Sequence, residues 1–307
     1  MRVAVGGQEW NAGHGFIRAR LAPGNLHRSG MIGQCAPGRS TSGAKIGGMS
    51  ITASRGVMAA CLIVLGALST TLAHADQRAN FLAGRTRECQ RCDLAGGNFK
   101  RRDLSGVDLT GANLKDTNFH DARLAGARLA GADLTGANLN KANLSRADLA
   151  GAVLRDAMLY AAILDGAKLA GADLTDALMG VARLTRADFT QATLRNVDLR
   201  KARLADAILT GADLRAAALD FAFLRGARFD TASLKEARLM GVEAIEASFV
   251  GADLSGANAL GANLRGADLS RAVLAGANLR RANMYETRLE GALFRATAMP
   301  DGTVRDE

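Results

Sequence analysis

The sequence predicts an all-β solenoid, a four-sided parallel β-helix, from three observations. A large apolar residue, usually Leu, occupies every fifth position from Leu94 to Met299, with Ala244 and Ala259 as exceptions. A small residue, usually Ala, precedes almost every large one by two positions, and Asp or Asn commonly lies between them. Glycine is frequent, at 35 of 307 residues, and aromatic residues make up 4%, which suits a narrow repetitive core.

A period of five matches neither an α-helix, at ~3.6 residues per turn, nor a flat strand, at ~2. A short strand that turns a corner every five residues does match, because its small and large apolar residues then both point inward. Four such sides close a coil, and successive coils stack through backbone hydrogen bonds at ~4.8 Å. Residues 92–299 are therefore expected to form about ten coils, with glycine at corners where tight turns require a positive φ.

The run from Gly131 to Asn143, G-A-D-L-T-G-A-N-L-N-K-A-N, shows this repeat directly. It resembles the A-(D/N)-L-x-x pattern of the pentapeptide-repeat family, and the resemblance covers about two thirds of the chain. The resemblance implies a right-handed quadrilateral β-helix. Each coil would contact mainly its neighbours, and both ends would need protection, because an open coil presents unpaired strand edges.

The segments beside the repeat are candidates for that protection. Residues 76–91 carry Phe81 and Leu82 and predict a short capping helix at the N-terminal end. At the other end only the tail 300–307 remains, so we expect the last coil to be bare or covered by a second copy. The sequence thus predicts a homodimer that forms through the C-terminal coil, Leu289 to Met299.

The first 75 residues divide into two segments. Residues 1–48 show no sustained period and no apolar run, so we expect them to be disordered or not translated. Residues 49–75 have the layout of a secretory signal peptide: basic Arg55, an apolar run over 57–72, and small residues at the cleavage site that ends at Ala75. That run is shorter than the ~20 residues of a membrane span. Cleavage after Ala75 would give a periplasmic or secreted protein, and only an uncleaved signal segment would hold it in a membrane.

The net charge of +9 lies mostly outside the repeat. Residues 1–75 hold seven basic residues and one acidic residue, which leaves 32 basic and 29 acidic residues, a net charge of +3, in the rest. A nucleic-acid partner is therefore not predicted. Some pentapeptide-repeat proteins protect DNA gyrase from fluoroquinolones by imitating duplex DNA, which requires a strongly negative surface. The residual positive charge and the predicted export argue against a cytoplasmic DNA mimic.

The motif Cys89-x-x-Cys92-Asp93-Leu94 is the one recognisable chemical signature. Similar openings occur at the start of other pentapeptide-repeat proteins. Three interpretations stay open: a disulfide or packed thiols that pin the cap to the first coil, a metal site that needs two more ligands, and a redox pair that lacks a βαβ context. The first is favoured, and no metal or cofactor is predicted.

No catalytic residue is predicted. Residues 76–307 contain a single histidine, His120, and no Ser-His-acid set, phosphate loop or H-E-x-x-H motif. The Asp and Asn residues recur at one position of the repeat, which indicates hydrogen bonds to the turns. A β-helix enzyme acting on polysaccharide would need a carboxylate cluster, and the sequence singles none out.

Outward-facing apolar residues gather on two adjoining sides from the middle of the rod onward. They are Met158, Tyr160, Leu178, Phe221, Phe223, Met240, Ile245 and Leu260. Contiguous apolar patches with Met, Phe and Tyr often mark interfaces, and the alternative is loss of repeat regularity without function. The sequence predicts a non-enzymatic, exported protein-interaction or scaffold solenoid with an unknown protein partner.

Overall fold

The computed structural model describes residues 2–5, 8–11, 44–46, 49–51 and 76–307. The chain divides into two compact units, Met1–Ala60 and Cys61–Glu307, and each is described by itself.

The first unit contains two antiparallel hairpins. β1 (Arg2–Val5) pairs with β2 (Gln8–Asn11), and β3 (Ala44–Ile46) pairs with β4 (Met49–Ile51). β1, β2 and β3 lie in the segment that composition predicts to be disordered, and a hairpin can pair its own backbone groups locally without a core. Apart from β4, the predicted signal peptide lies outside the described residues.

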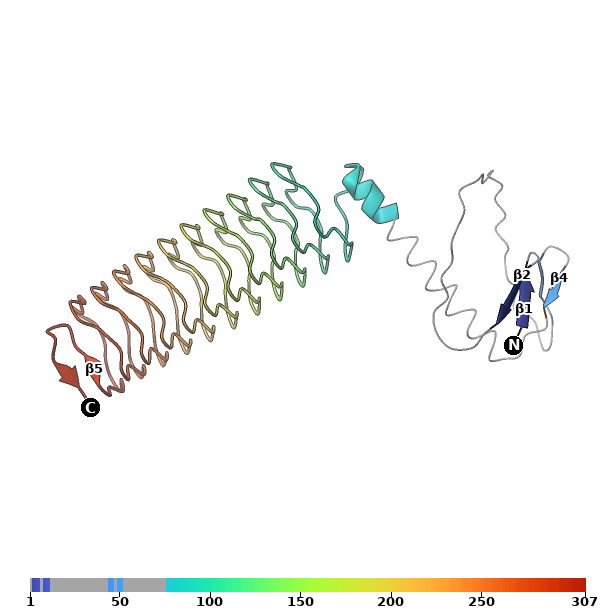
Figure 1. Cartoon of the computed structure of the whole chain (residues 1–307). Helices are drawn as coiled ribbons and strands as arrows, with labels where there is room; N and C mark the ends of the chain where they lie inside the picture. Colours follow the sequence, from blue (N-terminus) through green and yellow to red (C-terminus); the bar gives the residue numbers. More distant parts are fainter. Residues whose placement is uncertain (1, 6–7, 12–43, 47–48, 52–75) are drawn as a thin grey trace. The chain divides into compact units, whose positions relative to one another are not determined.

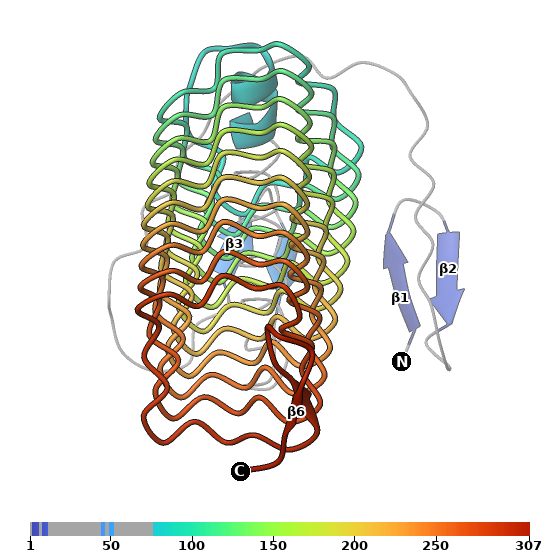
Figure 2. The same cartoon turned by 90° about the vertical axis from the view of Figure 1, so that its left-hand side faces the viewer.

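In the second unit the chain winds into a parallel β-helix (Figures 1 and 2). Each residue before a large apolar centre bridges its counterpart 20 positions on, as in Asp93↔Asn113 and Asn113↔Asp133. The amide of Leu94 donates to the carbonyl of Asn113 at 2.8 Å, and the same bond recurs from coil to coil. A coil of 20 residues with a centre every five has four sides. We number the sides by their first centres: Leu94 lies on side 1, Phe99 on side 2, Leu104 on side 3 and Leu109 on side 4.

The core is a stack of small and large side chains inside the coils. Ala132 and Leu134 both have 0% of their surface exposed, and the pattern continues along the rod. Burying one Leu side chain contributes about 1.5–3 kcal/mol, so the repeat accumulates stability coil by coil. Where Phe replaces Leu on successive coils, the rings stack: the centroids of Phe229 and Phe249 are 4.9 Å apart with planes at 6°.

The corners explain the polar part of the repeat. The amide of Thr135 donates to Oδ1 of Asp133 at 3.1 Å, and the amide of Ser145 donates to Oδ1 of Asn143 at 3.0 Å. These Asx turns confirm the predicted role of the recurring Asp and Asn residues. The corner residue two positions after each centre from Leu94 to Phe294 has a positive φ, which glycine adopts without strain.

The N-terminal end is covered by residues 76–82, which are helical and precede the first coil (Figure 1). Phe81 is 4% exposed, and its ring centroid lies 5.9 Å from that of Phe99. Nε of Arg78 donates to the carbonyl of Asp93 at 2.7 Å. The helix thus covers apolar side chains that the first coil would otherwise expose.

The C-terminal tail is more ordered than the sequence indicated. β5 (Thr297–Ala298) and β6 (Val304–Arg305) form an antiparallel hairpin at the end of the rod (Figure 2). The guanidinium of Arg305 lies 3.8 Å from the ring centroid of Phe294, which is 5% exposed. The last coil is therefore not bare around Phe294, because a cation–π contact holds the tail over it.

Other core residues of the last coil are less well covered. Met284, Leu289 and Met299 are only partly buried. In the described part of the chain the amides of Met284 and Leu289 have no backbone acceptor. Sides 3 and 4 of the last coil therefore remain the exposed strand edges at this end of the solenoid.

Candidate interaction surface

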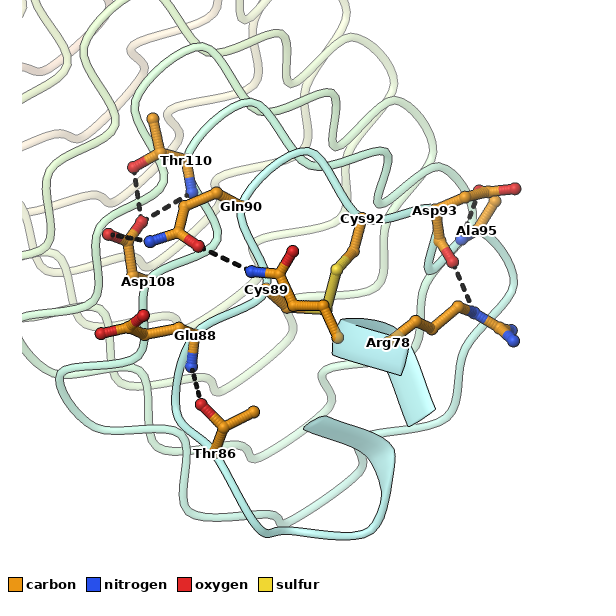
Figure 3. Close-up of a disulfide and its surroundings, with 11 residues drawn as sticks. Arg78, Thr86, Glu88, Cys89, Gln90, Cys92, Asp93, Ala95, Asp108 and Thr110 are labelled. Atoms are coloured by element: carbon orange, nitrogen blue, oxygen red, sulfur yellow. Dashed lines mark hydrogen bonds between the residues drawn. A yellow bond between two sulfur atoms is a disulfide. The ribbon is translucent and has the colours of Figure 1, made fainter. Parts of the chain in front are cut away.

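Cys89 and Cys92 form a disulfide at the first corner of the solenoid (Figure 3), with an S–S distance of 2.09 Å and Cα atoms 5.3 Å apart. Cys89 occupies a large-apolar position and Cys92 the following small position, and both are buried. The amide of Cys92 donates to the carbonyl of Cys89 at 3.3 Å, the same turn that joins Ala112 to Leu109 at 3.0 Å. The repeat itself brings these positions within disulfide range.

The disulfide lies between the cap and the first coils. The side chain of Gln77, in the cap, donates to that of Gln90 at 2.8 Å, and Gln90 donates to Asp108, one coil on, at 3.0 Å. No cluster of three or more His, Cys, Asp or Glu residues that could hold a metal ion occurs in the part of the chain that the structure describes. The arrangement is that of a structural staple.

The predicted interface residues form an outward-facing group on sides 2 and 3, here called the apolar patch. Four of them are about half exposed: Tyr160 at 53%, Leu178 at 50%, Phe221 at 49% and Phe223 at 47%. The other four, Met158, Met240, Ile245 and Leu260, are half-buried. The structure therefore places all eight residues at outward positions of the same two sides.

Two aromatic rings of the apolar patch rest on glycines of the next coil. A Cβ atom at Gly241 would lie 2.8 Å from the ring of Phe221, and one at Gly180 would lie 3.5 Å from the ring of Tyr160. Gly180 is unusual, because it occupies the position directly after a centre rather than the corner. These glycines let the rings approach the backbone while leaving half of their surface exposed.

Val181 belongs to the same surface but was not among the predicted residues. It is 42% exposed and lies at a corner with a φ of 59°. Glycine occupies the same column at 241 and 261. A signal was present in the sequence, since a β-branched residue is disfavoured at a corner that requires positive φ.

Several aspartates of side 1 pair with cations of the same side. Asp133 pairs with Lys115 at 3.2 Å and Asp173 with Arg155 at 2.6 Å. Asp213 pairs with both Arg195 and Arg215. Hydrogen bonds from Arg215 lower the pKa of Asp213 to about 2, although its burial acts in the opposite direction. The aspartates directly before the centres of side 1, from Asp133 to Asp253, are therefore charge-compensated.

The repeat itself decides the family. The model for pentapeptide repeats matches eight copies in overlapping segments between residues 88 and 295. The chain belongs to the pentapeptide-repeat family. The resemblance drawn from the sequence is thereby confirmed, and the structural neighbours in this family form right-handed β-helices.

Several solved pentapeptide-repeat structures resemble the chain. HetL from the cyanobacterium Nostoc sp. strain PCC 7120, which is involved in heterocyst differentiation regulation, is 33% identical over 74% of this chain and 97% of its own, with a TM-score of 0.49. A pentapeptide-repeat protein of the Arabidopsis thaliana thylakoid lumen is 32% identical over 33% of this chain and 68% of its own, with a TM-score of 0.31. QnrB1, a plasmid-mediated fluoroquinolone resistance protein, is 21% identical over 65% of this chain and 87% of its own, with a TM-score of 0.42. No curated protein matches the chain.

The pentapeptide-repeat solenoid includes no helix with the length and apolar character needed to cross a membrane, within the residues that the structure describes.

Proposed function

We propose that this chain is an exported, non-enzymatic protein-interaction solenoid that binds a partner protein through the apolar patch. The observation that carries the proposal is the group of four large apolar side chains, Tyr160, Leu178, Phe221 and Phe223, that lie about half exposed on sides 2 and 3. Aromatic and other large apolar side chains that protrude from a rigid scaffold are the usual anchors of protein interfaces.

The β-helix supports this role because it fixes the patch in advance. The core residues beneath it, such as Leu159, Met179 and Leu219, are fully buried. Met158, Leu178 and Phe223 each form β-bridges with the coils on both sides. A pre-organised surface loses little conformational entropy on binding. Burial of the apolar patch against a partner can therefore contribute to binding affinity with little entropic cost.

Two features support export. Residues 49–75 have the layout of a cleavable signal peptide, and Cys89 and Cys92 pair in a disulfide. Disulfides form and persist mainly in oxidising compartments such as the periplasm and the extracellular space. A cytoplasmic DNA mimic is less well supported, because Asp133, Asp173 and Asp213 on side 1 are paired with cations of the same side.

The proposal is tested by replacing Tyr160, Phe221 and Met240 together with Ser. Affinity purification of the tagged chain from its own host should recover the partner with the wild type and at least tenfold less with this variant. The matched control replaces Leu82, Tyr285 and Val304 with Ser, because these residues are also exposed but lie outside the patch. Equal recovery by both variants, each with an unchanged circular dichroism spectrum, would refute the proposal.

A further inference from the structure

The corner between sides 2 and 3 stacks cations directly between apolar residues. Val181, Lys201 and Phe221 follow one another in one column, 20 positions apart, and Arg183, Arg203 and Phe223 do so in the neighbouring column. We call these six residues the cationic edge. All six are exposed. The edge therefore presents positive charge and apolar surface within three consecutive coils.

Arg183 and Arg203 face each other across a bridge between adjacent coils. Like charges directly opposite on neighbouring strands destabilise a sheet. Elsewhere the bridging columns avoid such pairs, as where Asp148 bridges Lys168, and the one other case is Glu88 with Asp108 at the first coil. The solenoid thus keeps a repulsive pair in the middle of the rod.

The repulsion is only partly relieved inside the chain. Arg183 pairs with Asp165 at 2.6 Å. In the described part of the chain Arg203 and Lys201 form no ion pair. On side 1, by contrast, Asp133, Asp173 and Asp213 each have a cationic partner. Two of the three cations of the cationic edge, Lys201 and Arg203, are therefore without an ion pair in the described residues, whereas the cations Lys115, Arg155 and Arg195 of side 1 pair with aspartates of that side.

The apolar members of the edge are also held at a conformational cost. Val181 has a φ of 59° and Phe221 a φ of 58°, in the left-handed region that branched and bulky side chains rarely adopt. The same φ occurs at 24 non-glycine residues along the solenoid and belongs to the repeat, but Val181 and Phe221 place large apolar side chains there. Two large apolar corner residues therefore lie on the same three coils as the repulsive arginine pair.

We propose that the partner contacts the cationic edge with an acidic segment that carries apolar side chains on both sides of its acidic residues. This inference rests on the proposed function and names the chemistry of its partner. Val181 and Phe221 are two coils apart, ~10 Å, with Lys201 and Arg203 between them. A helix with apolar residues seven positions apart, ~10.5 Å, and Asp or Glu between them has the complementary spacing.

A photo-crosslinker placed by the substitution Leu178→p-benzoylphenylalanine tests the inference in the host. Leu178 is exposed beside the cationic edge. The adduct should map to a partner segment of net negative charge, and Lys201→Glu should lower its yield at least tenfold. The matched control is Arg271→Glu, which makes the same change of charge at a corner with the same φ of 58°, on the diagonally opposite corner of the coil. Its yield should equal that of the wild type.

Arg203→Glu separates a binding role from a structural one. It removes the repulsion with Arg183, so the unfolding temperature should stay constant or rise while the adduct yield falls. If the crosslinked partner segment is neutral or basic, or if Lys201→Glu leaves the adduct yield unchanged, the inference of an acidic partner segment is wrong. The proposed function would still stand. Adducts to lipid alone would overturn the acidic protein segment as the ligand of the cationic edge and would indicate a membrane surface instead. No adduct of any kind would refute the proposed function itself.

Discussion

The ring of Phe221 lies over Gly241, one coil further along the rod, and a Cβ atom at Gly241 would come within 2.8 Å of two ring carbons. The glycine therefore has two roles: it adopts the corner φ of 61°, and it leaves room for the ring. Gly261, in the same column with a φ of 66°, has the first role only, because a Cβ atom at Gly261 would have no atom within 4 Å.

Gly241→Ala should accordingly weaken both the fold and the partner contact. Either alanine substitution costs roughly 1–2 kcal/mol of unfolding free energy, because alanine is strained in the left-handed region. Gly241→Ala should cost about 1 kcal/mol more, since Phe221 must also move. Chemical denaturation of the two variants measures the difference, and an equal loss would show that the ring is not held by Gly241.

The disulfide should contribute modestly to stability. Closing so short a loop is worth about 2 kcal/mol in the chain-entropy model. The unfolding temperature of the wild type should therefore fall when a reductant is added. The double variant Cys89→Leu, Cys92→Ala restores the Leu and Ala that occupy these positions in other corners, and its unfolding temperature should not respond to reductant. Two free thiols in the unreduced wild type would contradict the staple.

Acid should destabilise the solenoid partly through Asp213. Its folded pKa, about 2, lies below the ordinary value of 3.8. A depressed pKa contributes stability that is present above pH ~4 and is lost as the pH falls toward 2. Asp213→Asn should therefore lose less in unfolding temperature between pH 5 and pH 2 than the wild type does. The control is Asp176→Asn, an exposed corner residue, which should follow the wild type; an identical pH response in Asp213→Asn would contradict the assignment.

The last coil should pair with a second copy. Met284, Leu289 and Met299 are partly buried although they occupy core positions, and the β5–β6 hairpin covers the region of Phe294 instead. Burying this end in a dimer would cover the remaining apolar surface and the free strand edges. Light scattering at micromolar concentration should give twice the mass of one chain, decreasing on dilution, whereas a strictly monomeric mass would exclude the pairing.

Much of the solenoid follows from one periodicity. Because the spacing never shifts between Leu94 and Met299, the sequence alone determines which residues face inward and which stack 20 positions apart. The same register assigns the apolar patch to two adjoining sides. The register also places Cys89 at a large position and Cys92 at the following small position. Every corner of the solenoid brings two such positions close together.

Other features depend on contacts that a repeat does not encode. The C-terminal hairpin is held by Arg305 on Phe294 and by Asp306, which accepts from the amide of Ala296 at 2.7 Å. A tail of eight residues without periodicity carries no sign of such contacts. The uncompensated charge of Lys201 likewise becomes visible only when ion pairs are resolved, because nearby Asp198 and Arg200 pair with each other at 2.6 Å.

The proposed function requires the chain to work outside the cytoplasm, in a compartment where the disulfide persists. Intact mass measurement of the protein made in its own host, after cell fractionation, tests this directly. A chain that begins at Asp76, in the periplasm or the medium, with the mass of one disulfide, is the predicted result. A full-length chain with free thiols in the cytosol would contradict it.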